Sequence, residues 1–389
     1  MKLTLKLFFF SLFLCLNEPI LAQSSETQVK KDSIEEKKSV SKDIRKEDGV
    51  MSYNWNSGKI TFGGVIHRTV MYVADGINND IFFMDSEQPP TQLKMNIENN
   101  LNDNISVFGK FLIGLQSNRP IEVSQDNKNP GVVFRAIISE VGFRHSKIGS
   151  IELGRGFTSS SVFNQADLSG TSTGSLIAIG NLAPGMKFSD RDANELSDRQ
   201  VFNYFFDTQR LFVADRIRFD SNSFGGGFTL AGSLAADDRW DASLRYFPKA
   251  GKFTFRGVVT YEQKPFKDIY SRTVLGFGLR HEKSGVNISA LGSYGETTDK
   301  RDPYGYVVKA GVTRSFTELG NTAFSIDYTQ NEDAVIEGEK ASSYGFFANQ
   351  RIDPIRVVVY AGYRKYEVQE TDLNLHPLNT VTLGVSFSF

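Results

Sequence analysis

Cationic side chains recur at every second position in several short runs of this 389-residue sequence, such as Arg216-Ile217-Arg218. Residues two apart project from the same face of an extended strand, so these charges would form rows opposite rows of apolar side chains. Arginine keeps its charge in almost any environment. The pattern therefore predicts electrostatic chemistry, in which fixed charges attract and orient ions and dipolar solutes in water.

Residues that could perform bond chemistry do not form a recognisable site. The histidines show no metal-ligand spacing, and no serine lies in a strand–turn–helix nucleophile setting. Cys15 is the only cysteine, and the histidines are His67, His145, His281 and His376. We therefore expect no enzymatic activity, no metal and no cofactor.

The N-terminal residues divide into two segments. Residues 1–22 resemble a secretory signal peptide, with Lys2 and Lys6 before an apolar run that is too short to span a bilayer. Cys15 lies within it, so the mature chain would have no disulfide. Residues 23–50 are charged and lack aromatic residues, which predicts a periplasmic tail, disordered or partly helical. Subtracting Lys2, Lys6 and Glu18 leaves 42 basic and 44 acidic residues, which gives no sign of a nucleic-acid partner.

From Gly58 onward, apolar and polar residues alternate with a period of two, which predicts strands. We count sixteen: one near residues 58–73, two flanking 99–104, two flanking 146–149, and eleven after a long connection. Short turns alternate with longer polar loops. Strands of about ten residues, even in number and joined in this way, are typical of an outer-membrane barrel. We predict an all-β fold over residues 51–389, a transmembrane antiparallel barrel of sixteen strands.

The direction in which the apolar rows point distinguishes a membrane barrel from a soluble sandwich. A barrel turns them outward to lipid because hydrocarbon requires every backbone group to be paired, whereas a sandwich turns them inward. The 32 Phe and 14 Tyr residues, several at strand ends, fit an aromatic girdle. The other face carries Arg and Gly repeatedly, which fits a water-filled lumen.

The connection after the fifth predicted strand, residues 156–207, has no sustained period. Connections of this length are usually functional or disordered. This one contains Phe163, Ile177 and Met186 among its polar residues, and a disordered linker would be poorer in apolar residues. We therefore predict a loop that packs inside the barrel.

Together these features resemble the Gram-negative general porin family, whose members are sixteen-stranded trimeric barrels. The residues that carry the resemblance are Gly58–Phe62, Val141–Phe143, Gly149–Arg155, Arg216–Ser221, and the ending Leu383–Phe389. The resemblance implies a homotrimer in the outer membrane, in contact with lipid and lipopolysaccharide. It also implies recognition of the Phe389 strand by the barrel-assembly machinery and passive diffusion of small hydrophilic solutes past the inward loop.

Candidate pore residues follow from the alternation and from this resemblance. The basic wall would include Lys94, Lys110, Arg144, Arg216 and Arg218, and the loop acids facing it would be Asp190, Asp192 and Glu195. Further lumen candidates are Arg245, Arg256, Arg272, Arg280, Lys309, Arg356 and Arg364, with Glu98, Glu140, Asp220, Asp241, Glu262 and Asp327. Because basic residues outnumber acids on these strands, we expect a slight preference for anions.

Arg155 and the exact function leave alternatives open. Strict alternation from Ile151 and Leu153 points Arg155 at lipid, whereas the resemblance favours the pore, which a bulge at Gly154 would permit. A substrate-specific channel, or a barrel with another role such as an adhesin, is the alternative to a diffusion pore.

Overall fold

The computed structural model describes residues 44–47, 50–205, 213–248, 251–265, 269–299 and 301–389. The chain divides into two units, Met1–Ser41 and Lys42–Phe389, and all described residues belong to the second. The predicted signal peptide and most of the predicted tail therefore lie outside the described residues. In the described part of the chain, no helix is long and apolar enough to cross a membrane.

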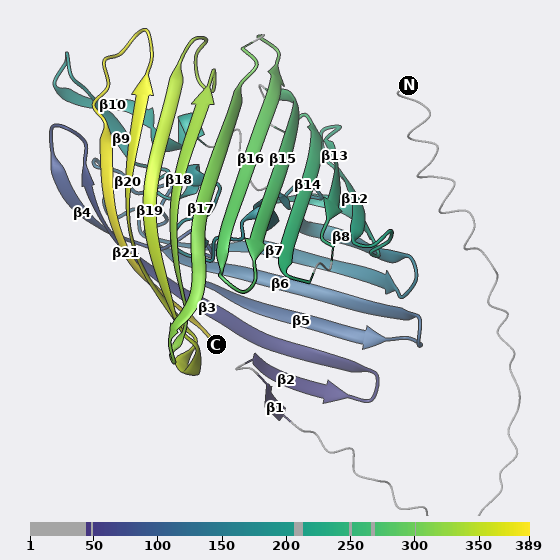
Figure 1. Cartoon of the computed structure of the whole chain (residues 1–389). Helices are drawn as coiled ribbons and strands as arrows, with labels where there is room; N and C mark the ends of the chain where they lie inside the picture. The colour runs from purple at the N-terminus through teal and green to yellow at the C-terminus, as the bar shows by residue number, and fades with distance from the viewer. Residues whose placement is uncertain (1–43, 48–49, 206–212, 249–250, 266–268, 300) are drawn as a thin grey trace, which may run out of the picture. The chain divides into compact units, whose positions relative to one another are not determined.

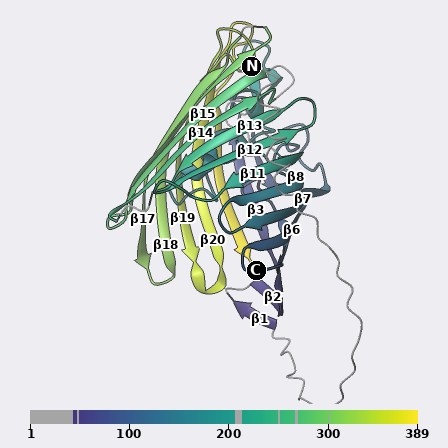
Figure 2. The same cartoon turned by 90° about the vertical axis from the view of Figure 1, so that its right-hand side faces the viewer.

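Sixteen antiparallel strands form the closed wall of the second unit, as the sequence predicts (Figure 1). β3 pairs with β21 and β8 pairs with β11, which closes the sheet across the ends of the chain and across the long loop. Figure 2 shows β11, β12 and β13 continuing the wall beside β8. The wall strands are β3 (Gly58–Ala74), β5 (Gln92–Asn100), β6 (Ile105–Ser117), β7 (Val132–His145), β8 (Gly149–Phe157), β11 (Val213–Ser221), β12 (Phe228–Ala235), β13 (Trp240–Tyr246), β14 (Phe253–Gln263), β15 (Ile269–His281), β16 (Val286–Thr297), β17 (Tyr304–Thr317), β18 (Gly320–Glu332), β19 (Lys340–Ile352), β20 (Val357–Gln369) and β21 (Leu378–Ser388).

The apolar rows of these strands face outward. Leu153 is 56% exposed and Leu383 is 55% exposed, whereas Lys309 and Arg364 are completely buried on the inner face. Exposed apolar side chains on nearly every strand would be unfavourable in water, but they match a hydrocarbon solvent. The wall therefore has the orientation that the sequence predicts for a membrane barrel.

Additional strands modify this wall near β3. β4 (Asn79–Met84) and β5 both pair with β3, so residues 85–91 leave the wall between them. β2 (Val50–Trp55) pairs with β3 next to the end of β21, and β1 (Ile44–Glu47) pairs with β2. Residues 44–47 were predicted to belong to the N-terminal tail, but they are a strand of the sheet because β2 offers them a pairing edge.

The segment between β8 and β11 packs against the inward-facing side chains of the wall. It contains short helices η2 (Phe163–Ala166), η3 (Ile179–Asn181) and α2 (Val201–Phe205), and the hairpin β9 (Lys187–Asp190) with β10 (Glu195–Gln200). Its apolar residues join a buried cluster with inward residues of β3, β4, β14–β17, β19 and β20. Apolar burial of this kind supplies most of the energy that orders a long loop.

Candidate pore-lining site

The inner faces of β5–β8, β11 and β13 carry a set of charged side chains that we call the charged arc. Its members are Lys94, Glu98, Lys110, Glu140, Arg144, Glu152, Arg216, Arg218, Asp220, Asp241 and Arg245. All except Lys94 have an ion-pair or hydrogen-bond partner named below. Alternation places these residues inside, because their neighbours along each strand form the exposed apolar rows.

Arg216 lies at the centre of a buried network with two glutamates. Its Nη2 atom is 2.7 Å from Glu140 Oε2 and 2.9 Å from Glu152 Oε2, and its side chain is 1% exposed. Lys110 Nζ completes the network at 3.0 Å from Glu140 and 2.9 Å from Glu152. Two cations and two carboxylates give no net charge, so this part of the wall presents an alternating field rather than a positive surface.

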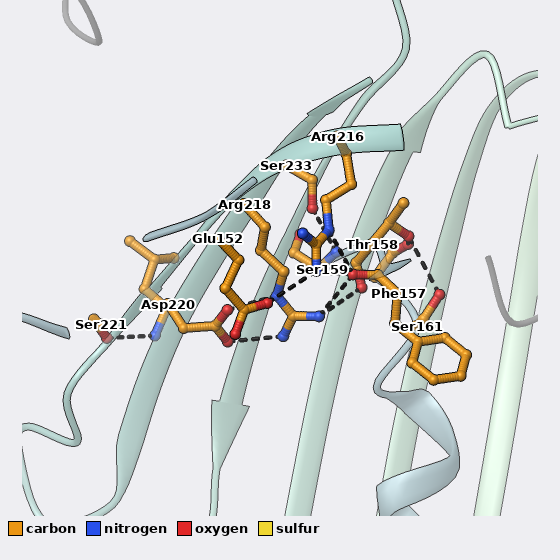
Figure 3. A network of polar contacts seen from close by, with 12 residues as sticks. Glu152, Phe157, Thr158, Ser159, Ser161, Arg216, Arg218, Asp220, Ser221 and Ser233 are labelled. Carbon is orange, nitrogen blue, oxygen red and sulfur yellow. Dashed lines mark hydrogen bonds and ion pairs between the residues drawn. The ribbon is translucent and has the colours of Figure 1, made fainter. Parts of the chain in front are cut away.

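Arg216 and Arg218 also hold the start of the long loop (Figure 3). Arg216 Nε donates to Phe157 O at 3.0 Å, and Arg218 Nη1 donates to Phe157 O and Thr158 O at 3.1 and 3.0 Å. Asp220 accepts hydrogen bonds from both Arg218 and Arg245. The two arginines predicted for the pore wall are therefore largely occupied in positioning the loop.

Further along the loop, polar contacts reach strands on other parts of the wall. Ser159 and Ser160 donate to Asp241 on β13 at 2.6 and 2.8 Å. The Leu168 amide donates to Ser289 on β16 at 2.9 Å. These contacts are spaced along the loop so that its backbone follows the inner face of the wall.

Two buried ion pairs continue this line of contacts. Lys309 Nζ on β17 is 3.2 Å from Asp167 Oδ2, and it also donates to Ser175 O. Arg364 on β20 is 2.7 Å from Asp327 on β18 and donates to Ser175 Oγ at 3.2 Å. All four charged side chains are at most 1% exposed. Removal of one partner from such a pair leaves an unpaired buried charge, so the Lys309–Asp167 pair, which joins the wall to the loop, opposes displacement of the loop.

The part of the charged arc at the turn end of the barrel, where short turns join the strands, is more exposed to solvent. Arg144 Nη1 is 2.7 Å from Glu98 Oε1, and both side chains are nearly half exposed. The Phe108 ring lies beneath two cations, with Lys110 Nζ and Arg144 Cζ at 4.9 and 4.8 Å from its centroid. Lys94 lies on the same face of β5, four residues before Glu98, and has no carboxylate partner among the described residues.

Arg155 does not belong to this site. The pairings of β8 with β7 and with β11 keep a continuous register through Gly154, so the bulge that would have turned Arg155 inward is not formed. Arg155 points outward, 43% exposed, and its Nη1 atom is 3.5 Å from Asp215 Oδ2. The assignment of Arg155 to the pore by family resemblance is wrong, and strict alternation gave its direction correctly.

The predicted loop acids also lie elsewhere. Asp190, Asp192 and Glu195 are in or next to the β9–β10 hairpin, which bonds to residues 374–376 at the loop end of the barrel. The structure does not bring them to the charged arc. The acids that do face the basic wall residues are on neighbouring strands, because cross-strand register decides which charges meet.

Three acidic side chains that pair with basic residues of the wall, or of segments next to it, were not recognised from the sequence. Glu152 was not recognised because it falls within the predicted fifth strand beside Arg155, although its alternation with Ile151 and Leu153 points it inward. Asp167 lies in the loop and gave no periodic signal. Glu87 lies in the excursion from the wall, where it is 2.7 Å from Arg119 and 3.2 Å from Arg135.

A buried carboxyl group marks the loop end of the barrel. Glu339, between β18 and β19, accepts hydrogen bonds from the Ala334 and Ile336 amides at 3.0 Å each. Burial raises the pKa of Glu339 to about 7, despite these hydrogen bonds. No cluster of three or more potential metal ligands occurs in the described residues.

Comparison with known proteins identifies the family. The model of the Gram-negative porin family matches residues 46–371. No curated protein sequence matches the chain. Among solved structures, it is similar to an anion-selective porin from Comamonas acidovorans, with a TM-score of 0.60 and 14% identity over 85% of this chain and 100% of that one. It is also similar to Salmonella typhi OmpF in complex with daunomycin, with a TM-score of 0.57 and 12% identity over 87% of this chain and 100% of that one.

A third similar structure is OmpT expressed in the outer membrane of Vibrio cholerae. Its TM-score is 0.57 at 10% identity, over 86% of this chain and 99% of that one. At these identities the structures establish the fold alone, whereas the family model covers most of the chain. The sixteen-stranded wall and this match place the protein in the outer membrane as a multi-pass barrel and channel. The chain belongs to the Gram-negative porin family.

Proposed function

We propose that this barrel is a water-filled channel for the passive diffusion of ions and small hydrophilic solutes. The observation that carries the proposal is the separation of the two faces of the wall. Apolar rows face out, and the charged arc faces in. Ionised side chains at several levels of an inner surface are stable only where water reaches them or where each has a partner. Lys94, Glu98, Arg144 and Lys110 are the most accessible members of the arc.

The segment 156–207 would narrow this channel opposite the charged arc. Its bonds to Ser289, Lys309 and Arg364 support a position against the far wall. Ser172, in the central part of this segment, is exposed to solvent and has an uncharged side chain. The charge that a passing solute meets would therefore come mainly from the wall.

A slight preference for anions follows from the charges of the arc. Six basic side chains face five acidic ones, so the arc has an excess of one positive charge. Rows of charged side chains set ion preference in such pores. The Comamonas acidovorans porin named above is described as anion-selective, which supports the same direction here.

We also propose a homotrimer, because one similar structure, of Vibrio cholerae OmpT, is described as a trimer form. Outer-membrane lipid, lipopolysaccharide and the barrel-assembly machinery, acting on the Phe389 strand, are the other expected partners. The family is one of channels, and we propose no catalytic activity for this chain.

Planar-bilayer recording tests the channel. We expect stepwise, persistent conductance increments from purified folded protein, and a reversal potential in a KCl gradient that is displaced slightly toward the chloride equilibrium potential. Folded protein that produces no increments would contradict the proposal.

A substrate-specific channel is the second candidate, favoured by the large apolar cluster that the loop forms inside the barrel. The two functions differ in their concentration dependence. A diffusion pore gives a flux proportional to solute concentration, whereas a specific channel saturates with one solute class.

A further inference from the structure

Beside the charged arc, and sharing Arg245 with it, a second group of arginines faces the lumen at the turn end of β13, β14 and β15. Arg245 lies one residue before the end of β13, Arg256 lies near the start of β14, and Arg280 lies one residue before the end of β15. Their outward neighbours Leu244, Phe253 and Phe277 are exposed apolar residues, so the arginines point inward. We propose that these three arginines, with Phe247, form a binding site for small solutes that carry two or more anionic groups. The proposal rests on the channel function proposed above.

The cations of this site are incompletely neutralised. Arg245 shares Asp220 with Arg218, and Arg280 binds Glu282 at 3.0 Å. Arg256 has no carboxylate partner among the described residues. These four arginines therefore face two carboxylates, which leaves an excess of two positive charges.

Several donors of the site are also unused. Arg256 donates one hydrogen bond, from Nη1 to Gln165 O at 3.1 Å, although a guanidinium group offers five N–H donors. Arg245 Nε is buried and has no hydrogen-bond partner. Buried donors of this kind are usually satisfied by water or by a ligand, and phosphate and carboxylate oxygens match the arginine fork best.

Phe247 gives the site a fixed geometry. The Arg256 guanidinium carbon is 5.0 Å from the centroid of the Phe247 ring, which holds the planar group by a cation–π contact. Phe247 itself packs against the apolar cluster of the barrel interior. An arginine fixed in this way loses less conformational entropy when it binds an anion.

The excess of two positive charges favours a solute with at least two anionic groups over a monovalent ion. A monovalent anion can neutralise only one of the excess charges, and water competes with it effectively in an open lumen. A solute with adjacent anionic groups can contact Arg256 together with Arg245 or Arg280. Pyrophosphate and citrate are suitable probes, and acetate is the monovalent control.

Block of single-channel current measures the binding. We expect pyrophosphate or citrate, added on the turn-end side at constant ionic strength, to reduce the conductance of wild-type protein, and acetate to leave it unchanged. Block by both probes supports recognition of charge, and block by one restricts the class to phosphates or to carboxylates. In Arg256→Gln, the half-blocking concentration should rise by up to about fivefold, which is the upper value for one partly solvated ion pair.

Arg256→Gln is suited to this test because it breaks no ion pair, and Arg280→Gln provides a second variant. Arg314→Gln is the matched control, since Arg314 is exposed on the outer face at the same end of the barrel. Block should remain at the wild-type concentration in this control. Conducting wild-type protein that neither probe blocks, or block unchanged in Arg256→Gln, would overturn the site and leave the channel intact. If folded wild-type protein showed no conductance at all, the channel function itself would be overturned.

Discussion

Replacement of Lys309 by methionine tests whether the long loop is fixed to the wall by buried charge. Lys309 is completely buried, and its Nζ atom contacts both Asp167 Oδ2 and Ser175 O. Methionine has a similar length but no charge, so the variant leaves the Asp167 carboxylate, 1% exposed, without its cation. Asp167 must then be hydrated or protonated, and hydration requires the loop to leave the wall.

The size of the effect follows from the cost of an unpaired buried charge. Removal of one partner of a buried ion pair costs about 3–5 kcal/mol. If the whole cost falls on the form in which the loop lies against the wall, the ratio of molecules with a displaced loop to molecules with a bound loop rises about 10²- to nearly 10⁴-fold. Leu176 and Ile177, now buried, would become accessible in the form with a displaced loop.

Limited proteolysis of the folded barrel reports this change directly. A protease that cleaves before apolar residues should cut Lys309→Met at residues 176–177 much faster than wild type. Open-channel current noise should increase in parallel. The double variant Lys309→Met/Asp167→Asn removes both charges and should recover most of the protection.

Lys340→Met provides the matched control, because Lys340 is 58% exposed and its Nζ atom is 3.6 Å from Glu332. Wild-type resistance is expected there. If Lys309→Met were as resistant as wild type, the loop would be held by its apolar cluster alone and the reasoning from buried charge would be refuted.

Three further predictions test other parts of the structure. Because the pKa of Glu339 is raised from 4.5 to about 7, folding stability should fall as pH rises through this interval; Glu339→Gln should remove the fall in melting temperature between these pH values. Arg155→Gln should leave the reversal potential in a salt gradient unchanged, and a shift would contradict its outward position. Gly278→Val should displace the loop and change the single-channel conductance, because the added Cβ would lie 2.1 Å from Ala166 O. Gly292→Val is the control and should leave the conductance unchanged, because no atom lies within 4 Å of its Cβ.

The sequence predicts the strands well because alternation is a local property. Each wall strand faces lipid on one side and the lumen on the other, so a period of two marks it without knowledge of its neighbours. The same alternation gave the directions of Arg216, Lys309 and Arg364. It also gave that of Arg155, which the family resemblance then obscured.

Interruptions of the sheet could not be predicted in this way. The register between β6 and β7 shifts at Leu112 and Ile113, so Ile137 faces inward and Val141 faces outward, although strict alternation put both on one face. A bulge leaves little trace in the sequence pattern, but it turns every side chain beyond it to the opposite face of the sheet. The excursion of residues 85–91 has no period to reveal it.

Roles of the candidate pore residues depended on contacts between distant segments. Arg216 was predicted as a basic residue of the pore wall, and its pairing with Glu140 and Glu152 and its bond to Phe157 O were not foreseen. These contacts depend on the register of four strands and on the path of the loop, neither of which a single sequence specifies.

Swelling of proteoliposomes tests the central claim most directly, because it measures passage of uncharged hydrophilic solutes. Vesicles containing the folded barrel should swell in isosmotic solutions of small sugars, at rates that fall steeply as the sugar becomes larger. Vesicles that contain correctly folded protein and swell with no sugar, however small, would contradict a water-filled diffusion channel.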